Sequence, residues 1–353
     1  MVHLPSLFSN IPREPLLYTH PSPIEPLSRL TSCLFPPSRF PTKLWIKRED
    51  SNSGLATGGN KIRKLEYVLA DALASSADVL VTTGGLQSNH MRQTAAAAAR
   101  CGLKCHLIPQ DRKSSVAPEY KTLGNVQITH LLGATHHPPN SDVETVLKNL
   151  KDQGDIPYWI PSGASTHPLG GLGYARFAFE ILEQEHEMGL FFDVIIVACA
   201  SGSTLGGMIA GFKLIARSQN SSDERDAHLR IDRTIIGIDC FAHEPGKSAK
   251  EILKIARTTG GRIGLLEEDI NEEDVVVDER WNGGKYGFLD DGTREGINKM
   301  AGAEGILTDP VYSGKAVTGL IGMAMGNELD GRGNVLFVHT GGVSALSAYP
   351  DLR

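Results

Sequence analysis

Apolar runs and helical patterns alternate along most of the chain. Short, continuously apolar or β-branched runs predict strands at 78–83, 104–109, 193–198, 234–239, 274–277 and 334–339. Between them, residues 87–100 and 205–216 have the composition and spacing of helices. Strands that are apolar throughout, rather than at every second position, are typical of parallel sheets covered on both faces. The pattern therefore predicts an α/β fold with mostly parallel sheets covered by helices.

Composition narrows the class of protein. A chain of 353 residues with 41% hydrophobic content is long enough for two domains. The net charge of −6 without blocks of like charge argues against nucleic acid or an anionic membrane as the main partner. No apolar run approaches the roughly 18 residues of a membrane-spanning helix.

The N-terminal segment and the cysteines indicate the compartment. Residues 1–41 are rich in proline and serine and lack the basic start and apolar core of a secretory signal. The five cysteines form no CxxC pair and are expected to be reduced thiols. We therefore expect a cytoplasmic protein whose residues 1–41 form an extended arm that wraps a domain or a partner subunit, with disorder of the first few residues as the alternative.

A lysine follows a glycine-rich turn at the start of a predicted amphipathic helix. Gly58, Gly59 and Asn60 precede Lys61, and the helical pattern continues over Ile62–Tyr67. Glycines allow the backbone to come close to a ligand, and a lysine held there can form a Schiff base with a carbonyl cofactor. Taken alone, the segment fits a surface loop followed by a helix better than a cofactor site, so the decision depends on the remaining segments.

Two further turns join a predicted strand to a predicted helix. Residues 199–204 (CASGST) combine hydroxyls, glycine amides and a helix N-terminus, which together form a phosphate cradle. Residues 84–89 (GGLQSN) place Ser88 and Asn89 at a helix start, where they can bind an amino-acid carboxylate. The structural alternative for both turns is helix capping.

Two segments near the C-terminus complete the set. Residues 308–315 combine Tyr312 with a neighbouring hydroxyl before a helix, and residues 338–342 end the last predicted strand with two glycines. Since ligands gather at the carboxyl ends of parallel strands, we expect the two strand–helix turns and both of these segments to lie at such ends. His243 and Glu244, which follow the predicted strand 234–239, are expected in an exposed loop, although that strand also ends near the cofactor side.

At this point several motifs resemble a known family. From about Lys43 to about Leu346, the chain is similar to the 1-aminocyclopropane-1-carboxylate (ACC) deaminase and D-cysteine desulfhydrase family, in GGNKIRKLEY, GGLQSNHMRQTAA, GNVQITHLLGA, HPLGGLGYARFAFE, GSTLGG and ILTDPVYSGKA. This family belongs to the fold type II, tryptophan synthase β-like enzymes that use pyridoxal 5'-phosphate (PLP). The resemblance implies a homodimer with PLP between two domains. We expect the larger domain at 1–60 plus 175–353 and the smaller at 61–174.

The resemblance also implies roles for individual residues. The expected catalytic residues are Lys61, which binds PLP covalently, with Ser88, Tyr286 and Tyr312. Cofactor contacts are expected from Lys61, Lys64, Asn89, Ser201, Gly202, Ser203, Thr204, Leu205, Tyr312, Ser313 and Thr340. Substrate contacts are expected from Gln87, Ser88, Asn89 and His90, and no metal is expected.

Two positions bear on the reaction. ACC deaminases have glutamate and leucine where this chain has Ser313 and Thr340, and the serine–threonine pair resembles the D-cysteine desulfhydrases. A carboxylate beside the pyridine nitrogen keeps it protonated, whereas a serine permits a neutral ring that is sufficient for β-elimination. We therefore expect a PLP-dependent lyase that converts D-cysteine to pyruvate, sulfide and ammonia.

Other functions are kept as alternatives. The first is ACC deaminase, which gives 2-oxobutanoate and ammonia and which the rest of the chain resembles more closely. The second is a related PLP enzyme with a specialised substrate, suggested by Leu205, where the family commonly has glutamine, and by Asp111 and Arg112, where deaminases have an aromatic residue. The third is a PLP-binding protein without turnover, against which the intact set Lys61, Ser88 and Tyr312 argues.

Overall fold

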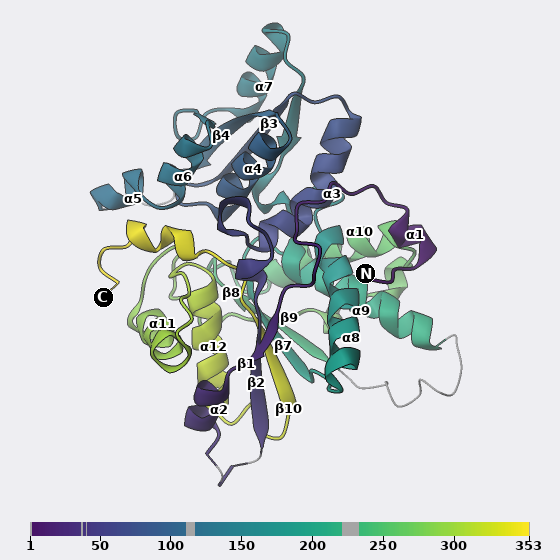
Figure 1. Ribbon diagram of the computed structural model, residues 1–353, viewed down its shortest axis with the longest axis vertical. Coiled ribbons are helices and arrows are strands. Elements are labelled where there is room, and N and C mark those ends of the chain that lie inside the picture. The colour runs from purple at the N-terminus through teal and green to yellow at the C-terminus, as the bar shows by residue number, and fades with distance from the viewer. Residues whose placement is uncertain (1, 37, 40, 111–116, 221–232, 353) are drawn as a thin grey trace.

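The computed structural model describes residues 2–36, 38–39, 41–110, 117–220 and 233–352. In this part of the chain two sheets form, one above the other in Figure 1. The larger sheet has the order β1 (Ile24–Pro26), β2 (Thr42–Lys47), β10 (Gly333–Val338), β7 (Val194–Cys199), β8 (Thr234–Asp239) and β9 (Val276–Asp278). The smaller has the order β5 (Thr135–His136), β4 (Lys104–Gln110), β3 (Val79–Gly85) and β6 (Pro157–Ile160).

The strand pairs are parallel except for one. β1 runs antiparallel to β2, whereas the described pairs of the rest of the larger sheet and of the smaller sheet are parallel. The chain therefore has the expected α/β fold with mostly parallel sheets. The helices are α1 (Ser6–Ser9), α2 (Ser28–Leu34), α3 (Asn60–Ala74), α4 (Asn89–Arg100), α5 (Pro118–Thr122), α6 (Asn125–Leu131), α7 (Val143–Asp152), α8 (Leu172–Met188), α9 (Ser203–Asn220), α10 (Lys247–Arg262), α11 (Asp291–Glu304) and α12 (Ser313–Met325).

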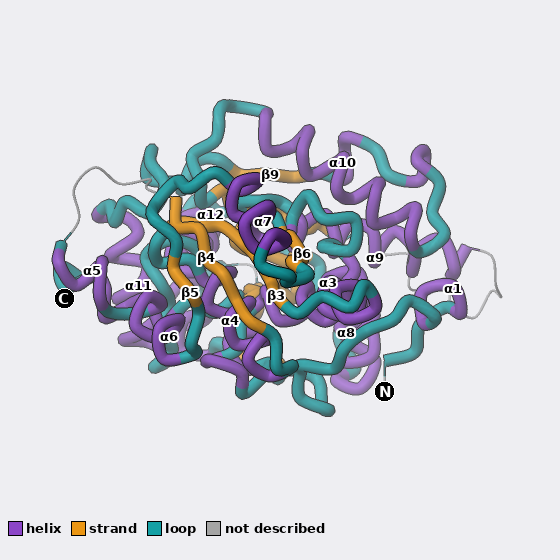
Figure 2. Tube along the Cα trace, turned by 90° about the horizontal axis from the view of Figure 1, so that it is seen from above, coloured by secondary structure: helices purple, strands orange, loops and turns teal. Residues whose placement is uncertain are grey.

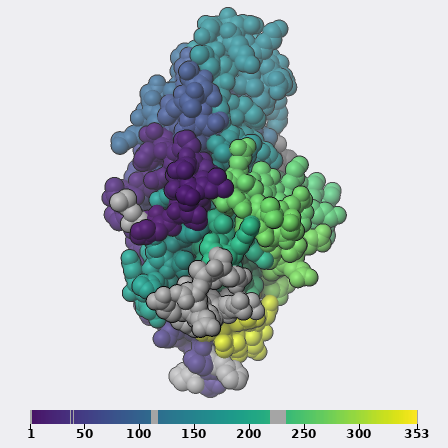
Figure 3. Space-filling view, turned by 90° about the vertical axis from the view of Figure 1, so that its right-hand side faces the viewer, coloured from purple at the N-terminus to yellow at the C-terminus, as the bar shows by residue number. Residues whose placement is uncertain are grey.

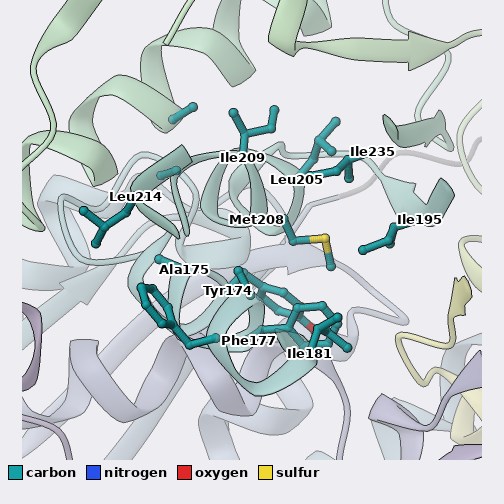
Figure 4. Close-up of a cluster of buried hydrophobic side chains, with 14 of the residues drawn as sticks. Tyr174, Ala175, Phe177, Ile181, Ile195, Leu205, Met208, Ile209, Leu214 and Ile235 are labelled. Atoms are coloured by element: carbon teal, nitrogen blue, oxygen red, sulfur yellow. The ribbon is translucent and has the colours of Figure 1, made fainter. Parts of the chain in front are cut away.

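Both faces of the larger sheet are buried, which explains its continuous apolar strands. On β7, Ile195 and Val197 pack against α8 and α9, including Phe177 and Met208 (Figure 4). The alternate β7 residues pack on the opposite face in the apolar cluster that includes α2 and α12. Since successive side chains of a strand point to opposite faces, burial on both sides requires apolar residues throughout.

The smaller sheet is covered in the same way. Leu80 of β3 packs with Leu65 of α3 and Met91 of α4. Val81 faces the other side, where it meets Val146 of α7. Figure 2 shows α7 lying over these strands. Each side of this sheet therefore has its own apolar layer.

The N-terminal arm lies along its own chain. Phe8 is buried in the core beside the larger sheet, and Leu16 is buried in the core of the smaller one. Figure 3 shows this segment on the surface, reaching from the larger part of the molecule toward the smaller. The arm is not extended throughout, because it contains α1, β1 and α2.

The strands of each sheet fall in the chain segments expected for the two domains, and the boundaries at 60/61 and 174/175 remain a prediction. Asp111 and Arg112 lie outside the described residues. Among the described helices, none is both long enough and apolar enough to cross a membrane.

Candidate functional site

Lys61 lies in the first turn of α3, at the wall of a cavity. The turn before it needs glycine: Gly59 has φ +120°, and a Cβ there would lie 2.7 Å from Nε2 of Gln93. Arg92 of α4 holds the same turn by donating to the carbonyl of Gly58 at 3.0 Å. The Asn60 amide then donates to the carbonyl of Thr340 at 3.1 Å. The glycine turn therefore sets Lys61 between elements of both sheets.

The cavity has a volume of about 290 Å³ and collects residues from the carboxyl ends of several strands. Gly85 ends β3, Cys199 ends β7, and Thr340 follows β10. One expectation was wrong: the segment 308–315 follows α11 rather than a strand, although it still brings Tyr312 to the cavity. The expected site residues that line the cavity are Lys61, Ser88, Asn89, His90, Ser201, Gly202, Thr204, Tyr286, Tyr312 and Thr340.

Hydroxyls gather at the N-terminus of α9. Ser165 donates to Oγ of Ser201 at 2.6 Å and lies 2.9 Å from Oγ of Ser203. Lys64 donates from Nζ to Oγ of Ser203 at 2.8 Å. Hydroxyl donors, a helix N-terminus and a lysine ammonium together favour a phosphate group. The cluster has the composition expected of a phosphate cradle, whose role remains a prediction, and Ser165, which lines the cavity, was not anticipated.

The two lysines of α3 have weakened proton affinity. Burial lowers the pKa of Lys61 to about 8. Burial, together with the charge of Lys61, holds the pKa of Lys64 well below its usual range. Since desolvation disfavours an ammonium ion, Lys61 is a neutral nucleophile at a lower pH than an exposed lysine.

Ser88 caps α4 and faces the cavity. Its hydroxyl accepts from the amide of Met91 at 3.2 Å, so its own proton remains for a ligand. His90 is buried and its pKa is lowered by burial and by the charges of Lys61 and Lys64, so its imidazole is neutral. The helix N-terminus adds favourable dipoles for a carboxylate.

Five expected site residues are not among those that line the cavity: Gln87, Lys64, Ser203, Leu205 and Ser313. The Gln87 amide donates to the carbonyls of Tyr120 and Leu123, each at 2.8 Å. The Leu205 side chain is fully buried in the core beside the larger sheet. The expected contacts of these residues with substrate and cofactor remain predictions.

Two tyrosine hydroxyls meet inside the cavity. Oη of Tyr286 lies 2.6 Å from Oη of Tyr312. Burial and the neighbouring Tyr286 hold the pKa of Tyr312 well above its usual range, so this hydroxyl keeps its proton at neutral pH. The pair can pass a proton between its two oxygen atoms.

Ser313 is bound to a buried carboxylate. Its hydroxyl donates to Oδ1 of Asp309 at 2.6 Å and accepts from the Asp309 amide at 3.0 Å. Oδ2 of Asp309 accepts from the amides of Val311 and Tyr312, each at 2.9 Å. The carbonyl of Gly341 lies 3.2 Å from the same hydroxyl and is the longer, weaker acceptor. A hydroxyl whose single proton goes to the carboxylate can only accept from any further partner.

Comparison with known proteins assigns the family. The model of the family described as "Pyridoxal-phosphate dependent enzyme" matches residues 16–341. The chain belongs to this family. It is 44% identical over 349 residues to the 1-aminocyclopropane-1-carboxylate deaminase of Burkholderia ambifaria (strain MC40-6), covering 97% of each chain. It is also 44% identical to the protein of that name from Burkholderia multivorans (strain ATCC 17616 / 249), covering 96% of each.

Solved structures agree with the family assignment. The chain is similar to a crystal structure of an ACC deaminase homologue, with a TM-score of 0.82 and 31% identity over 98% of this chain and 96% of the other. A structure of O-ureido-L-serine synthase has a TM-score of 0.60 with 16% identity, covering 98% and 95%, and shares the fold. The chain is therefore a PLP-dependent enzyme of the lyase and deaminase type.

The residues present fit the cofactor of this PLP-dependent family. The Ser165, Ser201 and Ser203 hydroxyls with Lys64 suit the phosphate, and Lys61 suits the aldehyde. The cradle leaves no space for a larger residue at Gly163, which has φ +66° and where a Cβ would lie 2.4 Å from Oγ of Ser201.

Sequence reasoning missed one side of the cavity of this PLP-dependent enzyme. Phe241 and His243 follow β8 and line the cavity, and Glu251 of α10 does so too. Glu244 is exposed as expected, but His243 is not in an exposed loop, since its side chain is 14% exposed. The available signal was the spacing of Asp239 and His243, an acid and a histidine four residues apart at the end of a buried strand.

Proposed function

We propose that the protein is an ACC deaminase, which converts ACC and water to 2-oxobutanoate and ammonia. The observation that carries the proposal is the hydrogen bond from Ser313 to the buried Asp309 carboxylate. The family resemblance expects residue 313 beside the pyridine nitrogen of PLP. An oxygen that can only accept pairs with a protonated ring nitrogen and not with a neutral one.

This hydrogen bond changes the argument made from the sequence. Ser313 was expected to permit a neutral ring, which favours β-elimination. With Asp309 behind it, Ser313 instead transmits the effect of a carboxylate, and opposite charge favours the protonated ring. Opening the ring of ACC needs a strong electron sink, because ACC has no α-hydrogen. The names of the 44% identical relatives support the same reaction.

The side chains of the cavity have distinct tasks in this proposal. Bound PLP supplies the electron sink for the reaction. Ser88 and the N-terminus of α4 bind the substrate carboxylate. Nζ of Lys61, with a pKa of about 8, holds or accepts a proton close to neutral pH. Tyr312 keeps its proton and can donate it from Oη, with Tyr286 beside it.

A second reaction is favoured by a specific observation. Ser313 and Thr340 together resemble the D-cysteine desulfhydrase members of the family, and Thr340 lines the cavity. β-Elimination from D-cysteine to pyruvate, sulfide and ammonia is therefore the second candidate. A specialised amino acid remains the third.

The test offers ACC and D-cysteine separately to purified, PLP-loaded protein. We expect 2-oxobutanoate and ammonia from ACC. Sulfide and pyruvate from D-cysteine without 2-oxobutanoate would establish the second reaction instead. Ser313→Ala should lower turnover of ACC more than any turnover of D-cysteine, because elimination tolerates a weaker electron sink. Ser32→Ala, which removes an exposed hydroxyl of α2, is the matched control.

We further propose a cytoplasmic homodimer, by analogy with the family. Light scattering on the PLP-loaded protein measures the mass in solution. A mass of one chain at micromolar concentration would contradict the dimer.

A further inference from the structure

A histidine and a buried carboxylate form a pair at the side of the cavity that the sequence reasoning missed. Nδ1 of His243 lies 3.1 Å from Oδ1 of Asp239, at the end of β8. Asp239 also accepts from the amides of Phe241 at 3.0 Å and His243 at 3.2 Å, and from Nδ2 of Asn282 at 3.3 Å. The carboxylate is thus held from three directions besides the imidazole, and its position does not depend on that ring.

The pair fixes which nitrogen of His243 carries a proton. Burial raises the pKa of Asp239, but the hydrogen bonds from His243 and from the Phe241 amide outweigh burial and leave it below its usual range. Asp239 is therefore ionised and can only accept, so Nδ1 of His243 is the donor. Nε2 makes no hydrogen bond to any described residue and is the nitrogen left for a ligand.

Aromatic rings hold the imidazole in place. The ring of Phe241 stacks on that of His243, with centroids 4.4 Å apart and an interplanar angle of 23°. Phe241 also contacts the ring of Tyr286, with centroids 4.9 Å apart. His243 therefore belongs to the same wall of the cavity as the tyrosine pair, and Lys61 lines the same cavity.

We propose that His243 is a catalytic acid that protonates the substrate carbon released on ring opening, with Asp239 as its positioning residue. This inference rests on the proposed function. The bond between the α-carbon and one ring methylene breaks, and its electron pair stays on that methylene. The proton of His243 Nε2 forms the new C–H bond, which gives the methyl group of 2-oxobutanoate. Nζ of Lys61 accepts one proton from the other methylene, and the electron pair of that C–H bond forms a double bond to the α-carbon. Water then replaces the nitrogen at the α-carbon, which releases 2-oxobutanoate and ammonia, and His243 regains its proton from solvent.

The chemistry of the pair suits this role. Histidine is the side chain that most readily exchanges a proton near neutral pH, and a carboxylate at Nδ1 fixes the orientation of the ring. The other titratable groups around His243 come from different elements. They are Asp239 of β8, Glu251 of α10, Lys315 of α12, whose ammonium interacts with Asp239, and Tyr286 in the loop before α11.

The test compares His243→Ala, His243→Gln and Asp239→Asn with the wild-type enzyme in the PLP-loaded form. Since a general acid contributes roughly 10²–10⁴-fold, we expect kcat for ACC to fall by about 10²-fold or more in both His243 variants. The dissociation constant for ACC, followed by the change in cofactor absorbance, should stay within about threefold, because the carboxylate is bound at Ser88. Added imidazole should restore part of the activity of His243→Ala.

Controls separate this role from a structural one. His186→Ala removes an exposed histidine from the last turn of α8 and should leave kcat unchanged. In the wild-type enzyme kcat should fall at alkaline pH, where the general acid has lost its proton, and this dependence on pH should be absent in His243→Gln. Asp239→Asn should lower kcat while retaining this dependence, because the imidazole loses the carboxylate that orients it.

Each outcome has a defined meaning. If wild-type protein converts ACC and His243→Ala keeps its kcat within about threefold, the inference is wrong and the proposed function stands. Loss of kcat without any rescue by imidazole, or with loss of cofactor absorbance, would also overturn it. If wild-type protein converts D-cysteine but not ACC, protonation of the substrate carbon by His243 is refuted together with the proposed function. Turnover of neither substrate refutes both as well.

Discussion

Replacement of Arg63 by methionine should lower the free energy of unfolding by about 3–5 kcal/mol at pH 8, the cost of removing one partner from a buried ion pair. Arg63 is fully buried in α3, two residues after Lys61. Nε and Nη2 donate to Glu49 at 2.5 and 2.8 Å, and Nη1 and Nη2 donate to Glu180 at 3.0 and 2.8 Å. Methionine leaves both carboxylates behind. Glu180 keeps Lys47, whose Nζ lies 2.5 Å away, so Glu49 is the carboxylate that loses its direct cation.

The loss should depend on pH in a defined direction. In the wild-type protein burial raises the pKa of Glu49, but Arg63 outweighs burial and leaves it lowered; the pKa of Glu180 is lowered in the same way. This stabilisation is complete above the ordinary glutamate pKa and is lost as pH falls through the folded-state values. In the variant, Glu49 is buried without its cation and its pKa rises above the ordinary value. The variant therefore gains stability as pH falls through that raised pKa, and the difference between the two proteins narrows.

Urea unfolding at pH 8 and pH 5.5, followed by circular dichroism and tryptophan fluorescence, measures both effects. Coincident transitions are required before a free energy is assigned. Arg217→Met is the control, since Arg217 pairs with Asp269 on the surface of α9 and should contribute less than about 1 kcal/mol at either pH. A loss below about 1 kcal/mol for Arg63→Met, or a loss of equal size at both pH values, would refute the charge argument.

Two further predictions concern cofactor binding. Protein stripped of PLP should attach the cofactor faster as pH rises through about 8, because the neutral form of Lys61 is the nucleophile. Stopped-flow absorbance measures the rate of attachment. A rate independent of pH, or cofactor absorbance retained by Lys61→Ala, would contradict the prediction. Gly163→Ala should weaken PLP binding about tenfold or more, since the strain of about 1–2 kcal/mol at φ +66° adds to contact with Ser201. Gly154→Ala, with φ +91° and no neighbour within 4 Å, is the matched control in the same titration, and equal effects of both substitutions would show that backbone strain alone is responsible.

The fold could be predicted where burial is two-sided. β7, β8 and β10 are apolar throughout because helices cover both faces of the larger sheet, and this pattern is visible in the sequence. β1 and β2 were not predicted. β2 pairs with β10, almost 300 residues away, and β1 is a three-residue edge strand, so neither carries a local signal of its position.

The site could be predicted where backbone chemistry limits the choice of residues. The glycine turn before Lys61 and the hydroxyl turn after β7 are recognisable because each fits one kind of ligand. Pairing between side chains is not recognisable in the same way. The sequence displays Ser313 without showing that its proton is committed to Asp309, and His243 without showing that Asp239 orients it, because both facts depend on how the loop folds.

Of the three basic residues at the start of α3, Arg63 is paired with carboxylates, whereas Lys61 and Lys64 are not. This difference explains why a ligand binds beside the two lysines. In a helix with 3.6 residues per turn, Lys61 and Lys64 share one face and Arg63 points to the opposite one. Arg63 is neutralised by Glu49 and Glu180, which fixes the helix against the turn that follows β2 and against α8. Lys61 and Lys64 have no carboxylate within ion-pair distance among the described residues, and burial lowers the pKa of both. Unpaired buried cations are costly, so this face of α3 is stabilised by a ligand that brings negative charge to Lys64 and a carbonyl carbon to Lys61, the two groups that one molecule of PLP carries.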